Sequence, residues 1–386
     1  MKKIIAHITL FLLAATLLTA CTDNDFPASA PEQGRLVVTY SVATTQTRAT
    51  EAGWGSNDWN ENTVNRLDLF VIDNEGNAKH YNTPSTYSYA DPQNGNYATL
   101  DVSDVITLAD VRNCQAAYLV ANCPSVANCT TLKELQTAMT AGGFVYNRKQ
   151  TESLFIMDAK GSITIDGDNI TLSFDLERAL AKIRIGVKTM TENNYQYPSY
   201  SLDNITYRMY NYATSTHVLS EAETYNNPRP DASDNFEDIS PDQTYNDDGS
   251  PKFVLYSYPN DWFDTKKEHK NGDRYSIDDL HNEAPIVEAK QTYVLLHAPY
   301  NGEYGYYKVP VNKQLPDIHD NRTFSEEEYN SIRDLYRLRR NHLYDISVII
   351  DSPGGPIEDP VIPDFTIRIN DWTEGGNYQL SPDDFV

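Results

Sequence analysis

Basic residues are scarce in this sequence. Its 386 residues include 31 Lys and Arg against 55 Asp and Glu, which gives a formal net charge of −24. Proteins that bind nucleic acid present a basic surface to the phosphates, so the composition argues against a nucleic-acid partner. We interpret the acidic surface as a source of solubility. The 27 tyrosines and the abundant Thr and Asn favour a secreted, β-rich protein.

Cysteine is also rare, and one of the four cysteines lies in the N-terminal leader. The other three are Cys114, Cys123 and Cys129, an odd number that leaves at least one thiol unpaired. An oxidising compartment would allow a disulfide between Cys123 and Cys129. No second CxxC pair and no nearby histidine accompany them, so we expect no metal site.

Recognised catalytic motifs are absent from the sequence. There is no nucleophile elbow, no P-loop and no HExxH helix. With 55 acidic residues, pairs of carboxylates arise by chance and do not by themselves indicate a glycosidase. His342 follows Arg340 closely, but its place at the start of a strand favours a structural hydrogen bond. We therefore expect no enzymatic activity, no catalytic residue and no cofactor.

The only long apolar run lies at the N-terminus. Lys2 and Lys3 precede residues 8–18, which are mostly apolar and too few to span a membrane. The run ends in Leu-Thr-Ala-Cys at residues 18–21, which is typical of a bacterial lipobox and predicts cleavage before Cys21 and acylation of that cysteine. An ordinary signal peptide is the alternative. Asp23 and Asp25 follow and resemble a surface-export tag of Bacteroidota lipoproteins.

The next stretch, residues 34–49, combines a strand with a cleavage site. Every second residue is apolar, which is the pattern of a strand with one buried face: Leu36, Val38, Tyr40 and Val42. Arg48 and Ala49 then lie in a run of small polar residues, where an exposed chain invites a trypsin-like protease. A strand that fills a fold and carries its own cleavage site makes sense if the strand is temporary.

Many short alternating segments follow, with few helices and no βαβ rhythm. They predict an all-β protein made of β-sandwiches. Two capping patterns, Thr131 with Glu134 and Ser325 with Glu328, each predict a short helix. Residues 176–187 favour helix in their first half and strand in their second. Residues 351–363, rich in Pro and Gly, are predicted to be a flexible linker before a last strand. The strands are expected at 66–72, 97–102, 115–122, 162–165, 170–174, 183–187, 205–212, 253–258, 292–297, 306–311, 343–350 and 365–372.

Several of these features occur together in an order that resembles one family. They are the lipobox at Cys21, the strand before Arg48, the segments 66–71 and 178–183, the Arg340–Tyr344 stretch and the late Asn-Asp-Trp at 370–372. Over the whole chain the sequence resembles the fimbrillins of Bacteroidota, the subunits of type V pili. The resemblance implies two tandem transthyretin-like β-sandwich domains. It also implies export as a lipoprotein, cleavage by an arginine-specific protease between Arg48 and Ala49, and polymerisation by strand exchange with other pilus subunits.

On this interpretation the chain divides into a lipoprotein signal peptide (1–20), a propeptide with the removable strand (21–48) and two domains (49–178 and 179–386). The acyl chain holds the precursor on the outer membrane until cleavage releases it. Removal of the first strand bares about four inward side chains, a deficit of roughly 6–12 kcal/mol. Phe365, Ile367 and Ile369 have the spacing of a donor strand that fills the site. The alternative is that they form only the last strand of their own domain.

The sequence is also compatible with other surface roles. A stalk subunit is favoured by the combination of Arg48 with a donor-like last strand, whereas a tip or anchor subunit is the nearest alternative. A surface lipoprotein that binds glycan or protein is a further alternative, in which Trp54, Trp59 and Trp262 form an exposed platform. The first strand stays in place in such a protein.

Overall fold

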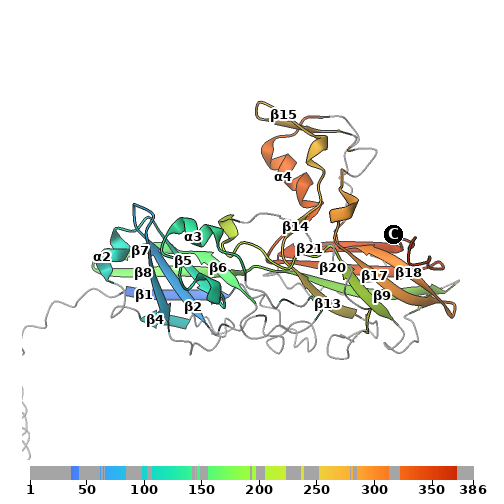
Figure 1. Cartoon of the computed structure of the whole chain (residues 1–386), viewed down its shortest axis with the longest axis horizontal. Coiled ribbons are helices and arrows are strands. Elements are labelled where there is room, and N and C mark those ends of the chain that lie inside the picture. The colour runs from blue at the N-terminus through green and yellow to red at the C-terminus, as the bar shows by residue number, and fades with distance from the viewer. Residues whose placement is uncertain are drawn as a thin grey trace, which may run out of the picture.

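Strands dominate the computed structural model of the chain, and they form two sandwiches that lie end to end (Figure 1). The structure describes residues 36–42, 61, 64, 66–83, 98–101, 107–140, 144, 146–147, 155–191, 194–196, 205–222, 236–238, 252–278, 280, 285–312 and 322–371.

The N-terminal sandwich is built from one long sheet that folds over its own core. The strand order is β3-β2-β5-β6-β8-β1-β4, and β7 also pairs with β8. β6 and β7 keep one register against β8, and between them a Cβ atom at Gly161 would lie 2.5 Å from the buried ring of Phe174, so a side chain there would displace that ring. The strands are β1 (Leu36–Val42), β2 (Leu67–Ile72), β3 (Ala78–Thr83), β4 (Ala98–Asp101), β5 (Ala116–Ala121), β6 (Met157–Lys160), β7 (Ser162–Asp166) and β8 (Asn169–Arg178).

Two short helices, α2 (Leu108–Arg112) and α3 (Leu132–Thr137), belong to this domain. The predicted cap of α3 is confirmed, because the Thr131 side chain accepts a hydrogen bond from the amide of Glu134. The Glu134 carboxylate bonds instead to the amide of Thr130, one residue before the position that a full capping box requires. The complete capping box of α2, between Thr107 and Asp110, was not predicted from the sequence.

The C-terminal sandwich packs two sheets over a second core. The first has the order β10-β9-β20-β21, with β13 also paired to β9, and the second has the order β12-β11-β17-β18. The strands of the first are β9 (Ala181–Thr191), β10 (Asn194–Gln196), β13 (Lys252–Ser257), β20 (His342–Ile350) and β21 (Asp364–Asp371). Those of the second are β11 (Thr206–Tyr210), β12 (Glu237–Asp238), β17 (Tyr293–Tyr300) and β18 (Glu303–Pro310).

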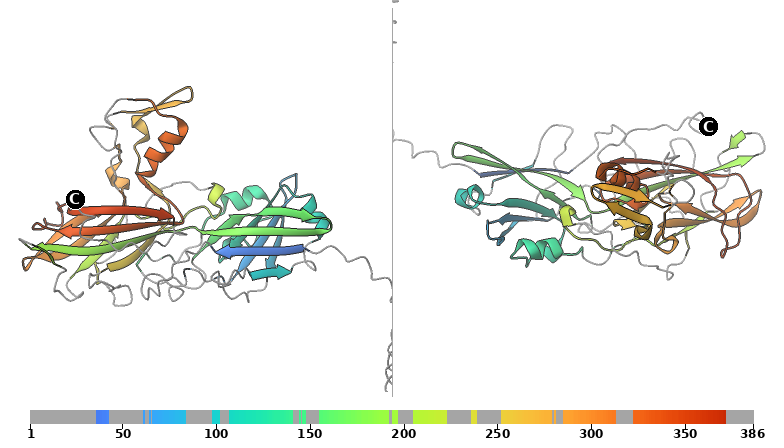
Figure 2. Two further views of the ribbon diagram at one scale, coloured as in Figure 1. Left: turned by 180° about the vertical axis from the view of Figure 1, so that it is seen from behind. Right: turned by 90° about the horizontal axis from the view of Figure 1, so that it is seen from above.

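An arm rises from the C-terminal sandwich on the side of β20 and β21 (Figures 1 and 2). It carries helix α4 (Glu326–Asp334) and the hairpin of β15 (Glu268–Asn271) and β16 (Arg274–Ile277), with β14 (Asn260–Asp261) and β19 (Arg337–Leu338) at its base. The predicted capping box of Ser325 and Glu328 is confirmed. The rings of Tyr275 and Tyr329 stack with centroids 4.3 Å apart and hold the hairpin against the helix.

The all-β prediction with two tandem sandwiches is confirmed. The helical preference of the first half of 176–187 is wrong, because β8 continues through Arg178. Pairing with β1 and β6 overrides the local propensity of these residues. Where β8 passes into β9, Leu180 still belongs to the first core and Ala181 already to the second, so the chain crosses between the domains there without a linker. Later residues, among them Val218 and Tyr256, also pack into the first core.

Residues 351–363 are not the flexible linker predicted from their Pro and Gly content. Residues 352–361, which we call the strap, lie along the edge of β18. The amide of Gly355 donates to the carbonyl of Tyr306 at 3.1 Å, and the amide of Tyr306 donates to the carbonyl of Gly355 at 2.9 Å. The amide of Lys308 donates to the carbonyl of Val361 at 2.8 Å. A Cβ on Gly305 would lie 2.5 Å from the Cα atom of Gly354. Facing glycines therefore let the strap approach the strand closely.

The described cysteines Cys114, Cys123 and Cys129 are free thiols, so the bridge that the sequence left open between Cys123 and Cys129 is not present. Burial raises the pKa of the Cys123 thiol, which disfavours the reactive thiolate. Within the described part of the chain, no helix has the length and apolar character needed to cross a membrane.

Stability should depend on the glycine contact under the strap. Gly305→Ala places a methyl group against the Gly354 backbone, and overpacking of this kind costs about 1–3 kcal/mol. We expect urea unfolding to show that loss, whereas Glu303→Ala, on the exposed start of the same strand, should change stability by less than about 0.5 kcal/mol. Equal stability of Gly305→Ala and the parent protein would contradict the close packing of the strap.

Candidate functional site: the first and last strands

Strand β1 lies inside the N-terminal sheet. It runs parallel to β8, from the pair Leu36 and Ile170 to the pair Val42 and Leu176. On its other side it runs antiparallel to β4, where Tyr40 pairs with Ala98. Both edges of β1 are thus hydrogen-bonded, and a side-chain bond from Thr39 to the Leu172 carbonyl at 3.3 Å adds to the β8 side.

The inward side chains of β1 are part of the first core. Leu36, Val38 and Tyr40 are 0%, 1% and 2% exposed. They belong to the same buried cluster as Ile170 and Phe174 of β8. The backbone of Val42 pairs in the strand, but its side chain lies outside the described residues. This burial means that β1 contributes to the fold and does not lie loosely on its surface.

Along the chain β1 is joined to the domain only through residues 43–60. That segment, which contains Arg48 and Ala49, lies outside the described residues, as does Cys21. All strand partners of β1 come much later in the sequence, at residues 98–101 and 170–176. A single cut in the joining segment would therefore leave β1 held by non-covalent contacts alone.

The C-terminal sandwich also pairs its first strand in parallel with a late strand, but without this feature. Strand β9 occupies the place of β1: it is parallel to the late strand β20 and antiparallel to β13. However, β9 follows β8 directly, through Ala179 and Leu180, both fully buried. A cut after β9 would leave β9 covalently attached to β8, whereas a cut within residues 43–60 separates β1 from every other described strand of its domain.

The predicted donor residues lie on β21, the last strand that the structure describes in their domain. β21 pairs antiparallel with β20, from His342 and Asp371 to Ile349 and Asp364, and it ends the path of its sheet. Phe365, Ile367 and Ile369 pack against the second core but are only partly buried. In this state they complete their own domain, the alternative that the sequence left open. Because they bury less surface than the β1 side chains, β21 is the easier strand to detach.

A buried ionic cluster fixes the chain just beyond the predicted cut. The carboxylate of Glu61, 2% exposed, lies 3.0 Å from Nζ of Lys182 and accepts a hydrogen bond from Tyr256. Its main-chain carbonyl accepts a bond from Arg178 at 2.9 Å. Burial raises the pKa of Glu61, and the Lys182 ammonium opposes that rise. The partners come from β8, β9 and β13, so Glu61 ties the segment after residue 60 to both domains.

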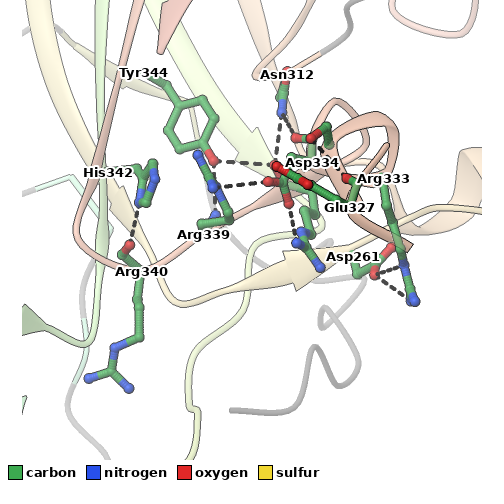
Figure 3. Close-up of polar contacts among 11 residues, drawn as sticks. Asp261, Asn312, Glu327, Arg333, Asp334, Arg339, Arg340, His342 and Tyr344 are labelled. Carbon is green, nitrogen blue, oxygen red and sulfur yellow. Dashed lines mark hydrogen bonds and ion pairs between the residues drawn. The ribbon is translucent and has the colours of Figure 1, made fainter. Parts of the chain in front are cut away.

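A second ionic pair crosses the junction. Arg340, which precedes β20, lies 2.6 Å from Asp158 of β6, and both side chains are buried. Neighbouring polar contacts at the base of the arm include an ion pair between Arg339 and Asp334 at 2.9 Å (Figure 3). Nδ1 of His342 lies 2.6 Å from the carbonyl oxygen of Arg340, which is the structural hydrogen bond predicted for this histidine (Figure 3).

The tryptophan platform of the surface-binding alternative is incomplete. Trp262 is fully buried and cannot contact a ligand on the surface, which corrects that part of the hypothesis. Trp54 and Trp59 lie outside the described residues. In the part of the chain that the structure describes, no group of three or more His, Cys, Asp or Glu side chains is placed to hold a metal ion.

Comparison with known proteins identifies similar folds among solved structures. One is a fimbrilin (FimA) from Porphyromonas gingivalis, at 12% identity and TM-score 0.47, covering 89% of this chain and 99% of that one. Another is the C-terminally truncated tip fimbrial protein Mfa3 from the same species, at 14% identity and TM-score 0.45, covering 88% and 99%. A fimbrial assembly protein from Parabacteroides distasonis matches at 15% identity and TM-score 0.41, covering 87% and 98%. No family model and no curated protein matches the chain.

The difference in burial between β1 and β21 should appear in stability measurements on the uncleaved protein. Leu36→Ala opens a cavity in the first core and should cost about 2–5 kcal/mol in urea unfolding. Ile367→Ala removes a half-buried side chain from an edge strand and should cost less than half as much. Equal losses for the two variants would contradict the contrast between an inner and an edge strand.

Replacement of Glu61 should destabilise the uncleaved protein strongly. Glu61→Gln leaves Lys182 buried without its counter-ion, and loss of one partner of a buried ion pair costs about 3–5 kcal/mol. The matched control is Lys160→Ala, which removes an exposed pair with Glu221 and should cost less than about 1 kcal/mol. Chemical unfolding of both variants measures the difference, and a Glu61→Gln protein as stable as the control would contradict the role of this cluster.

Proposed function

We propose that this protein is a structural subunit of a surface pilus, most simply a stalk subunit, which polymerises by exchange of strands between copies. The observation that supports this best is the position of β1. It is a buried inner strand, yet only one segment joins it to the domain, and that segment contains the predicted cleavage site at Arg48 and Ala49. The subunit would serve adhesion as part of the assembled fimbrium.

Export and processing precede assembly in this proposal. The lipobox directs acylation of Cys21, and the acyl chain retains the precursor at the outer membrane. An arginine-specific protease then cuts after Arg48. The lipid anchor and β1 both lie on the N-terminal side of that cut, so one cleavage releases the subunit from the membrane and frees β1 to leave.

Departure of β1 destabilises the first domain until another strand takes its place. Three described side chains, Leu36, Val38 and Tyr40, lose their place in the core, at about 1.5–3 kcal/mol each. The facing edges of β4 and β8 also lose their ladder partners. An incoming strand with the same alternation restores both contributions, which is β-strand addition.

Strand β21 of another copy is the proposed donor. Phe365, Ile367 and Ile369 repeat the two-residue spacing of Leu36, Val38 and Tyr40. The donor lies in the second domain and the acceptor in the first, so the contact joins different surfaces of the two copies. Such a heterologous contact does not close on itself and continues into a filament. A chain with both a donor and an acceptor fits a stalk better than a tip or an anchor.

Controlled cleavage of the purified precursor tests this function. An arginine-specific protease should yield a new N-terminus at Ala49 and, on denaturing gels without boiling, a ladder of multiples of the subunit mass. Arg48→Lys should stay uncut at this position and monomeric. Phe365→Asp with Ile367→Asp should be cut but fail to polymerise, because charged side chains cannot fill the β1 site. A cleaved protein that has lost β1 and stays monomeric at high concentration would overturn the proposal.

A further inference from the structure

Large apolar side chains are exposed at few described positions, and most of these lie at the two ends of the molecule. Tyr304, Ile357 and Ile362 are 52%, 41% and 49% exposed. Ile357 lies on the strap, Ile362 on its short continuation before β21, and Tyr304 on strand β18, along which the strap lies. We call these three residues the strap patch. Ile165, 52% exposed, lies at the tip of the β7–β8 hairpin. A contiguous exposed apolar patch marks an interaction site, whereas apolar residues exposed singly are common.

The strap patch lies at the end of the C-terminal domain away from the junction. Strand β20 starts beside the junction, where the amide of Asn341 donates to Leu180, and runs outward in parallel with β9. The strap follows β20, and β21 then begins at the outer end and returns towards the junction. Figures 1 and 2 show the β17–β18 hairpin at this outer end. The proposed donor strand thus starts at the outer end of its own molecule.

Ile165 marks the opposite end of the molecule. It pairs with Ile170 of β8, and Leu36 of β1 pairs with the same Ile170 from the other side. The start of the β1 site and the tip of the β7–β8 hairpin therefore lie together at the outer end of the N-terminal domain (Figure 1). The other end of the β1 site, at Leu176, lies next to the junction with the second domain.

The strap determines where the donor strand can swing out. Its hydrogen bonds to β18 end at Val361, so only the chain beyond it is free to leave when β21 detaches. Ile362 lies two residues before Asp364, about 7 Å of extended chain. Wherever β21 goes, the strap patch must lie at the entrance of the site that receives it.

We propose that the strap patch of one copy contacts the β7–β8 hairpin of the next copy, so that the donor strand enters the β1 site at Ile170 and runs in the direction of β1. This inference rests on the proposed function and adds to it a second, apolar contact between copies and a defined polarity of insertion. The outer end of the C-terminal domain of one copy then meets the outer end of the N-terminal domain of the next copy. Entry at Leu176 would instead require the strand to pass the second domain of the receiving copy.

Crosslinking within cleaved polymers tests the polarity. Cys21 and Cys114 are first replaced by Ser, and Ile362→Cys is combined with Ile165→Cys, Glu177→Cys or Met139→Cys. Ile165 lies two strands from the β1 site, so a bis-maleimide with a spacer of about 10 Å suits the distance. Glu177, exposed near the junction end, lies seven strand residues from Ile170, about 23 Å away. Met139, another exposed apolar residue of the first domain, is the matched control.

We expect crosslinked dimers from the pair with Ile165 and none from the pairs with Glu177 and Met139. Each variant must first show the same thermal unfolding before cleavage as its parent. Polymers that crosslink through Glu177, or through neither Ile165 nor Glu177, would overturn the inference and leave strand exchange standing. Loss of β1 without any polymer would overturn the proposed function, and this inference with it.

Discussion

The parallel pairing of β1 with β8 is the contact on which the rest of the molecule depends. β8 continues through two buried residues into β9, which is itself the parallel partner of β20. One uninterrupted stretch from Asn169 to Thr191 therefore provides the inner ladder of both sandwiches. Whatever strand occupies the β1 site is hydrogen-bonded to the segment that also organises the second domain.

Both domains pair their first strand in parallel with a late strand, but the two first strands differ in how they are held. In the second domain the first strand is covalently continuous with its predecessor, so its place is permanent. In the first domain the equivalent strand is held by burial and hydrogen bonds alone once the joining segment is cut. The ionic cluster around Glu61 then keeps the remaining chain attached to both domains. Departure of β1 need not loosen the junction.

Much of the fold could be predicted from the sequence, because apolar and polar residues alternate along strands with one buried face. The inward residues of β1 and the capping box of Ser325 follow from local patterns. The strap did not, because Pro and Gly content says nothing of a glycine 49 residues earlier that allows close packing. Glu61 was also missed, since its partners Lys182 and Tyr256 lie 121 and 195 residues away. The parallel pairing of β1 with β8 likewise joins residues far apart in the sequence and leaves no local pattern.

The direction of β8 has a mechanical consequence. It lies along the long axis of the molecule, from the outer end of the first domain to the junction (Figure 1). Tension applied from end to end would therefore load the ladder between β8 and its neighbour in shear, where all the hydrogen bonds resist together. Peeling, which breaks them one at a time, requires a pull across that axis. A chain of such molecules would resist stretching far better than bending.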